Sequence, residues 1–210
     1  MNRLTRRSLL PAALAAALIS TRASRAQSGG DIGQPLTALY GALESAMRAG
    51  HSVPFVQRFD ALAPVVDQAF DLDTVLRVSV GMRWDTMDPA VQARLLKAFR
   101  RFTVATYVAN FDKYDGERFQ VLPGSRASGA DRIVRTEMVS GNGDRVRLDY
   151  LMRDGSGTWR IVDVLLDGSI SRVAVQRSDF RKILAGGDAD ALIASLHRKV
   201  ADLSEGALSS

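Results

Sequence analysis

Two histidines are the first side chains to consider for chemistry, because imidazole serves both as a metal ligand and as a proton carrier near neutral pH. His51 and His197 lie far apart, and neither has a carboxylate, a serine or a second histidine at the spacing of a ligand set or a catalytic triad. The sequence contains no cysteine, which excludes disulfides, thiolate catalysis and cysteine-type zinc sites. It also contains no Walker-type, dinucleotide or Gly-x-Ser-x-Gly motif. The candidates that remain for catalysis are two carboxylates.

Two aspartates near the end of one expected strand are the candidates for such catalysis. Asp163 lies within residues 159–166, and Asp167 follows them directly. A carboxylate in the pocket of a small α+β protein can act as a general base, as it does in small isomerases. The same side chains would be inert if they faced solvent or paired with an arginine such as Arg160. The sequence leaves both interpretations open.

Three further aspartates, Asp67, Asp71 and Asp73, lie near a helix junction, where they could form an acidic metal site. Calcium loops, however, need more oxygen ligands and a different placement of glycine. An aspartate at the start of a helix has a simpler role, since its carboxylate accepts hydrogen bonds from the first free N–H groups. We therefore expect Asp71 or Asp73 to cap a helix over 72–80, and we expect no metal.

The beginning of the chain has the pattern of a secretory signal peptide. A basic stretch with Arg3, Arg6 and Arg7 precedes an apolar run over 9–19, and small side chains follow. The run is shorter than the roughly 20 residues that a membrane-spanning helix needs. We expect cleavage before Gln27 and export to the periplasm. The paired arginines leave both the general secretory route and the twin-arginine route open.

The charge balance argues against a nucleic-acid partner. The chain has 28 basic and 23 acidic residues, for a formal net charge of +5. Five of the arginines and none of the acids lie in the expected signal peptide, which leaves 23 basic and 23 acidic residues in the exported part. Nucleic-acid binding needs a surplus of lysine and arginine on one face. We therefore expect no nucleic-acid partner.

The spacing of apolar residues predicts helices at both ends of the exported chain. Apolar residues recur at every third or fourth position in four segments before residue 111, and Asp88 with Pro89 marks the start of the longest, 88–111. Pro64 is expected to end the second of these helices. Two more helical segments follow Gly168.

Between these helical regions the apolar period changes to two, which predicts strands. The expected strands are 118–122, 132–139, 145–152 and 159–166, separated by turn-forming clusters at 123–125, 140–144 and 154–157. The connections are too short for crossover helices, so the strands should form an antiparallel meander, and the fold class is α+β. The expected organisation is a signal peptide over 1–26, a linker over 27–34, a single domain over 35–205 and a tail over 206–210.

The sequence has more large apolar side chains than helix caps and turns require. The helix over 88–111 has an apolar arc, and in the strand over 145–152 the apolar Leu148 and Tyr150 alternate with charged residues. One face of the sheet is therefore expected to be covered. Periodicity does not separate a filled core from a hollow one, so both remain open.

Several short motifs occur together in an order that one known family shares. They include Phe70-Asp71-Leu72-Asp73, Val80-Gly81, Thr106-Tyr107, Ile161-Val162-Asp163-Val164, Asp167-Gly168 and Gly187-Asp188. On these motifs, residues 70–199 resemble the MlaC family of periplasmic phospholipid shuttles, also described as toluene-tolerance auxiliary components of an ABC transporter. Residues 110–117 and 167–177 are most similar to its hopanoid-associated HpnM branch. The sequence departs from the family at Gly168-Ser169-Ile170-Ser171, where the family usually has Gly-Val-Ser.

The resemblance implies a curved four-stranded antiparallel sheet, wrapped by N- and C-terminal helices around an apolar pocket and NTF2-like or cystatin-like in outline. It implies a carrier of phospholipid or a hopanoid-type lipid, with no other cofactor and no catalytic residue. The implied partners are an inner-membrane ABC transporter with its substrate-binding ring and an outer-membrane lipoprotein complex. Together with the apolar pattern, it predicts that the lipid contacts Trp84, Phe99, Phe102, Val104, Tyr107, Phe111, Val134, Thr136, Leu148, Tyr150, Trp159, Ile161 and Val164.

Two other functions remain open. One is a small-pocket enzyme or modifier in hopanoid or lipid metabolism that uses Asp163 or Asp167. The other is a structural adaptor of a membrane complex, which needs no pocket. An adaptor differs from a carrier because a carrier should retain about one lipid for each protein molecule.

Overall fold

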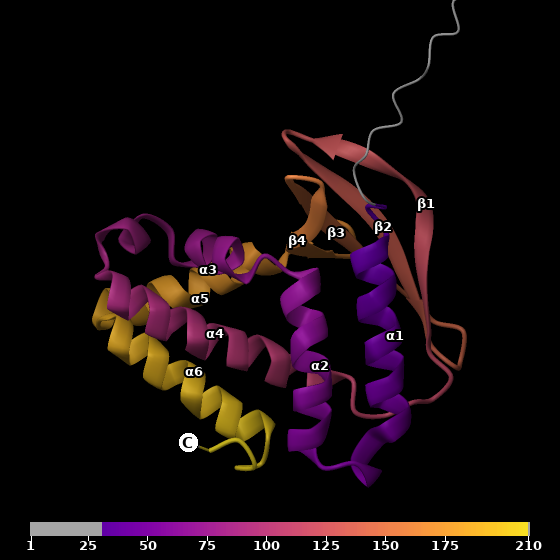
Figure 1. Ribbon diagram of the computed structural model, residues 1–210, viewed down its shortest axis with the longest axis horizontal. Coiled ribbons are helices and arrows are strands. Elements are labelled where there is room, and N and C mark those ends of the chain that lie inside the picture. Colours follow the sequence, from indigo (N-terminus) through magenta and orange to yellow (C-terminus); the bar gives the residue numbers. More distant parts are fainter. Residues whose placement is uncertain (1–30, 210) are drawn as a thin grey trace, which may run out of the picture.

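The computed structural model describes residues 31–209 (Figure 1). The expected signal peptide, and the expected linker up to residue 30, lie outside the described residues. Within the described part, the helices are α1 (Gln34–Ala49), α2 (Phe55–Ala69), α3 (Leu72–Val80), α4 (Pro89–Asn110), α5 (Arg172–Gly186) and α6 (Ala189–Leu203). The strands are β1 (Arg118–Ser128), β2 (Asp131–Val139), β3 (Arg145–Gly155), β4 (Thr158–Leu166) and β5 (Ile170–Ser171).

The strands form one antiparallel sheet in the order β1-β2-β3-β4-β5. This order confirms the predicted meander and the α+β class. The sheet has one strand more than predicted, because Ile170 and Ser171 pair with Leu166 and Leu165 at the edge of β4. The short β5 leads directly into α5.

The first strand is longer than predicted, because residues 123–125 form an irregularity within β1 instead of a turn. Its register with β2 shifts between Val121 and Ser125 and then continues to Ser128. Pro123 has no N–H to donate, and Gly124 has a φ of +77°, so the ladder is interrupted only locally. An irregularity of this kind bends a strand, and Figure 1 shows β1 as a long, curved strand beside α1.

The second helix does not end at Pro64, which corrects the prediction made from that residue. α2 continues through Pro64 to Ala69. The proline ring lies on the exposed side of the helix, whereas Leu62 and Val66 on either side of it are buried. Burial of these side chains outweighs the one backbone hydrogen bond that proline cannot donate.

Aspartates begin the next two helices, as predicted. The Asp71 carboxylate accepts hydrogen bonds from the backbone N–H of Thr74, at 3.0 Å, and from its hydroxyl, at 2.7 Å. The Asp88 carboxylate accepts from the N–H of Ala90 at 2.8 Å, and Pro89 is the first residue of α4. These caps fix the residues at which α3 and α4 begin.

Buried side chains from all the helices described and from β2, β3 and β4 form one core. α1 lies beside α2, and α4 runs alongside α6 (Figure 1). The expected tail joins this core, because Leu208 is buried and its carbonyl oxygen accepts a hydrogen bond from Arg101 at 2.6 Å. Among residues 31–209, no helix combines the length and the apolar character needed to cross a membrane.

Candidate functional site

A cavity of about 510 Å³ lies between the sheet and the helices. This volume is within the range of roughly 300–1,000 Å³ that is usual for ligand pockets. Side chains from α3, α4, α5, α6, β3 and β4 line it. Most of the lining is apolar or aromatic: Phe70, Leu72, Val75, Phe99, Phe102, Tyr107, Phe111, Leu148, Tyr150, Val164, Leu166, Val173, Val175 and Phe180. The cavity can therefore hold an apolar group of considerable size.

One wall of the cavity is a face of α4. Phe99, Phe102, Thr103, Thr106, Tyr107 and Asn110 all line the cavity, and their spacing of three and four places them on one side of the helix. Val104, which was also predicted to contact the ligand, lies on another side of α4 and is fully buried in the core. The apolar arc of the helix was predicted correctly, but it is wider than the part that faces the cavity.

The opposite wall comes from the middle of the sheet. Leu148 and Tyr150 of β3 alternate with charged residues and point to the same face. Across the ladder they pair with Leu166 and Val164 of β4, which also line the cavity. The alternation in β3 was sufficient to predict this wall.

Seven of the side chains predicted to contact a lipid line the cavity: Phe99, Phe102, Tyr107, Phe111, Leu148, Tyr150 and Val164. Six lie outside its lining: Trp84, Val104, Val134, Thr136, Trp159 and Ile161. Of these six, Trp159 is half-buried and the others are buried. Contact of any of these residues with a ligand stays a prediction.

Sequence reasoning did not select several lining side chains from α3, α5 and the segment before α3. Val75 belongs to the apolar face of α3, and Val173 and Phe180 belong to that of α5. Phe70 reaches the cavity because its backbone bridges to Ile161 of β4, where Asp71 N–H donates to the Ile161 carbonyl at 3.0 Å. Their periodicity showed that they would be buried but not which partner they would face.

Aromatic rings continue from the cavity into the core. Tyr107 lies between Phe70 and Phe111, with ring centroids 5.7 and 6.0 Å away. Phe111 in turn lies 5.8 Å from Phe119, which stacks on Tyr40 at 4.6 Å. Aromatic pairs at these separations contribute beyond the area that they bury. The helical wall is thus joined to α1 and β1.

Two of the tyrosines near the cavity are held in the neutral form. The Tyr40 hydroxyl lies 2.5 Å from Thr136 Oγ1, which donates to the carbonyl oxygen of Leu148 at 2.6 Å. Burial raises the pKa of Tyr40 to about 12 and raises that of Tyr150 well above its ordinary value. Both phenols therefore stay protonated near neutral pH and cannot act there as bases.

Asp163 lines the cavity, but the structure gives its carboxylate a structural role. Oδ1 accepts hydrogen bonds from the N–H groups of Val164, at 2.8 Å, and Val173, at 3.1 Å, while Oδ2 accepts from the Ser171 hydroxyl at 2.5 Å. Asp163 is half-buried, and its hydrogen-bond partners are these N–H and hydroxyl groups instead of an arginine such as Arg160. Both carboxylate oxygens are thus held by groups of the protein itself at the junction of β4, β5 and α5.

The other residues considered for chemistry lie away from the cavity lining. Asp167 is exposed, in a turn with a φ of +51°. His51 Nε2 is 3.1 Å from Asp112 Oδ2, although 61 residues separate them in the sequence. Asp67 forms a bidentate pair with Arg100, and Asp73 pairs with Arg77 at 3.6 Å, so the aspartates near the helix junction have separate partners.

Comparison with known proteins identifies the family. The model of the family described as MlaC protein matches residues 42–198. This chain belongs to the MlaC family. The predicted membership is thereby confirmed. No curated protein matches this chain in sequence.

Among solved structures, this MlaC family member is similar to the phospholipid-binding protein from Ralstonia solanacearum, which was determined in complex with a phospholipid. The TM-score is 0.70, with 20% sequence identity, and the match covers 83% of this chain and 99% of that one. At this identity the similarity shows that the two proteins share a fold.

The departure from the MlaC family pattern at residues 168–171 forms the approach to α5. Gly168 has a φ of +71°, and the Arg147 side chain packs where a Cβ atom would lie. Ile170 and Ser171 then form β5, and the Ser171 hydroxyl accepts from Ala174 N–H at 2.9 Å, which caps α5. Since Val173 lines the cavity, this segment sets the position of one edge of the lining.

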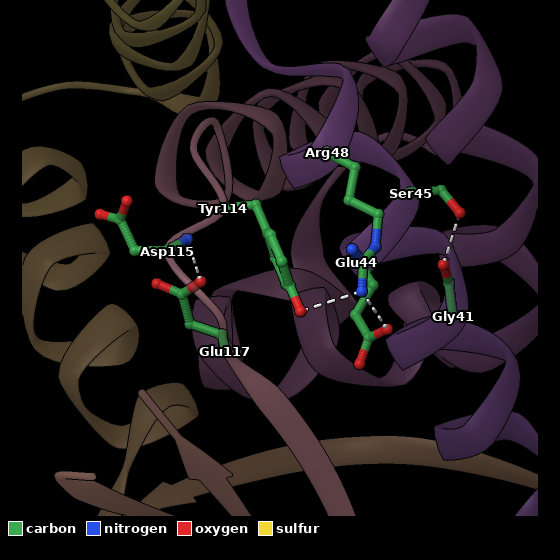
Figure 2. Close-up of polar contacts among 7 residues, drawn as sticks. All are labelled: Gly41, Glu44, Ser45, Arg48, Tyr114, Asp115 and Glu117. Atoms are coloured by element: carbon green, nitrogen blue, oxygen red, sulfur yellow. Dashed lines mark hydrogen bonds and ion pairs between the residues drawn. The ribbon is translucent and has the colours of Figure 1, made fainter. Parts of the chain in front are cut away.

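The segment that joins α4 to β1 is fastened to α1 (Figure 2). The Arg48 guanidinium donates to the Tyr114 hydroxyl at 2.9 Å and lies 3.9 Å from the centre of that ring. In the same segment, Glu117 accepts from the N–H of Asp115 at 2.6 Å. Phe111 begins this segment and lines the cavity, so the contacts in Figure 2 help to hold one part of the cavity wall in place.

Proposed function

We propose that the protein is a periplasmic lipid carrier, which holds the acyl part of a lipid in the cavity and moves it between membrane complexes of an ABC transport system without catalysing a reaction. The observation that carries the proposal is the cavity of about 510 Å³, whose walls are largely apolar, in a member of the MlaC family. The phospholipid bound to the structurally similar Ralstonia protein supports the same ligand class.

Burial energies favour transfer at a partner over release into water. Each buried CH₂ group contributes about 0.8 kcal/mol, so two chains of about 16 carbons would contribute roughly 25 kcal/mol before any costs. Spontaneous release into water would then be negligibly slow. We propose an inner-membrane transporter with its substrate-binding ring and an outer-membrane lipoprotein complex as the partners, as the family resemblance implies.

The ligand class extends to hopanoid-type lipids. The similarity of residues 110–117 and 167–177 to the HpnM branch supports this extension. Both stretches adjoin the cavity, since Asn110, Phe111, Arg172 and Gln176 line it. Differences within them could therefore change which lipid fits.

An enzymatic function is less well supported. Asp163 is the carboxylate that would have to act on a ligand in the cavity, yet its oxygens accept hydrogen bonds from Val164, Val173 and Ser171. Asp167 is not part of the cavity lining. A carrier needs no proton transfer, and the apolar lining suits it without further assumptions.

Native mass spectrometry of protein purified from periplasm, followed by lipid extraction, tests the proposal. A carrier should retain about one lipid for each protein molecule and release it unchanged. Protein that is free of lipid throughout would support an adaptor, and chemical conversion of added lipid would support an enzyme.

A further inference from the structure

One hydroxyl group in the cavity has no hydrogen-bond partner among residues 31–209. Tyr107 carries it and lines the cavity from α4. Each fully covered side-chain nitrogen or oxygen atom in that part of the chain has a partner, so the Tyr107 hydroxyl must be open to the cavity. By contrast, the hydroxyls of Thr103 and Thr106 on the same wall donate to carbonyls of their own helix, at 3.0 and 2.8 Å. The Tyr107 hydroxyl is therefore available to a ligand.

This hydroxyl has a proton to donate near neutral pH. Burial, followed by the nearby Tyr40, raises the pKa of Tyr107 well above its ordinary value, whereas the positive charge of Arg172 lowers it. The phenol therefore stays protonated. A buried donor that lacks an acceptor is unfavourable, so a ligand that places an oxygen beside it is stabilised.

A chain of hydrogen bonds ends at a second tyrosine of the cavity, Tyr150. Thr136 Oγ1 donates to the Leu148 carbonyl at 2.6 Å, so the Tyr40 hydroxyl, 2.5 Å from Thr136 Oγ1, must be the donor of that pair. The Tyr40 oxygen is then left to accept, and the Tyr150 hydroxyl supplies the proton. Tyr150 lines the cavity and is only 2% exposed. With its proton used in the chain, its oxygen remains as an acceptor.

The two tyrosines belong to opposite walls of the cavity, Tyr107 to α4 and Tyr150 to the sheet. They are close enough to interact, because after burial both Tyr40 and Tyr107 contribute to raising the pKa of Tyr150. The cavity thus presents one donor and one acceptor within otherwise largely apolar surroundings.

From this arrangement we infer that Tyr107 and Tyr150 bind an uncharged hydroxyl group on the apolar part of the ligand. This inference rests on the proposed carrier function and adds a specificity to it. A hydroxyl can accept from Tyr107 and donate to Tyr150, whereas an ester or ether oxygen can only accept and a plain hydrocarbon satisfies neither. The hydroxyl can belong to a hydroxylated acyl chain or to a fused-ring lipid, which differ in shape but share this chemistry.

Competition between lipids that differ by one hydroxyl tests the inference. The purified, delipidated mature protein is equilibrated with neutral detergent micelles that contain stearate and hydroxystearates, with the hydroxyl near the carboxylate, in the middle of the chain or near its methyl end. A second mixture contains cholestanol and cholestane, which distinguishes the fused-ring source. Native mass spectrometry measures the retained lipids. Two neutral hydrogen bonds should enrich at least one hydroxylated lipid by about tenfold over its parent.

Removing the Tyr107 hydroxyl should abolish the preference and leave the fold intact. Tyr107→Phe keeps the ring and removes a group with no partner in the described residues, so its lipid-free Tm should match that of wild type. It should retain hydroxylated and plain lipids equally, and Tyr150→Phe should lose the same selectivity. The matched control is Tyr114→Phe, which removes a hydroxyl that binds Arg48 outside the cavity lining and should keep the preference.

Equal retention of hydroxylated and plain lipids by wild type, or a preference that survives in Tyr107→Phe, would overturn the inference and leave the carrier function intact. If wild type retains none of these lipids, the inference fails. Retention of dipalmitoyl phosphatidylglycerol in a parallel sample then decides whether the carrier function fails with it.

Discussion

Replacing Leu148 with tryptophan should remove bound lipid without unfolding the protein. Leu148 is half-buried, lines the cavity from β3 and lies across the ladder from Leu166. An indole can extend into a cavity of about 510 Å³, where it would take space that an acyl chain needs. In a filled core the same enlargement would lower the free energy of unfolding by about 1–3 kcal/mol. For a domain of this size, that cost corresponds to a fall in Tm of roughly 2–12 °C.

Thermal unfolding with and without lipid measures the difference. Lipid-free Leu148→Trp should have a Tm within about 2 °C of that of lipid-free wild type. Lipid at 100 times its Kd should raise the free energy of unfolding of wild type by about 2.7 kcal/mol. Leu95→Trp is the matched control, because Leu95 is fully buried on α4 and lies outside the cavity lining. That variant should show the full overpacking cost. Strong destabilisation of Leu148→Trp, together with no lipid-dependent shift in wild type, would mean that the interior is filled and the reasoning is wrong.

Three further predictions address catalysis, pH and export. Asp163→Asn should lower the free energy of unfolding by about 1 kcal/mol, because fewer donors at the start of α5 are satisfied, and should leave the lipid content unchanged. Loss of function with the fold and the bound lipid intact would favour the enzyme instead. Burial raises the pKa of Tyr40 to about 12 and also raises those of Tyr107 and Tyr150, so the unfolded chain loses these protons first and the free energy of unfolding should fall above pH 10. Tyr40 alone should contribute up to ~1.4 kcal/mol per pH unit to that fall between pH 10 and 12, and urea denaturation of Tyr40→Phe should show a slope smaller by that share. N-terminal sequencing should show that the exported protein begins at Gln27, and an uncleaved chain in the inner membrane would contradict the soluble carrier. Replacing Arg6 and Arg7 with lysine should block export only if the protein uses the twin-arginine route.

Local patterns predicted the fold class because the spacing of apolar residues differs between helices and strands and can be read within each segment. Alternation in β3 placed Leu148 and Tyr150 on the covered face, and Asp88 with Pro89 marked the start of α4. Single residues were less reliable as boundaries. Pro64 did not end α2, because its ring points to solvent while its neighbours are buried, and Pro123 bends β1 without ending it.

Which buried side chains face a cavity depends on packing between elements that are distant in the sequence. Val104 is as apolar as its neighbours but lies on a side of α4 that the core covers. Val134 and Thr136 share the inner face of the sheet with Leu148 and Tyr150, yet they lie on β2, outside the cavity lining. Periodicity identifies a buried face but not what lies opposite it. The cavity could therefore not be predicted from the sequence, because it depends on how the helices pack against the sheet.

The central claim is that the cavity holds the acyl part of a lipid, and photo-crosslinking tests it most directly. A phospholipid with a diazirine at the end of one acyl chain is bound to the purified protein, and the complex is irradiated. The adducts are then located by peptide mass spectrometry. We expect adducts on residues of the cavity wall, such as Phe102, Tyr107 and Leu148. Their yield should fall when an unlabelled lipid competes. Adducts confined to the exposed residues of the sheet, or unaffected by competition, would contradict the claim.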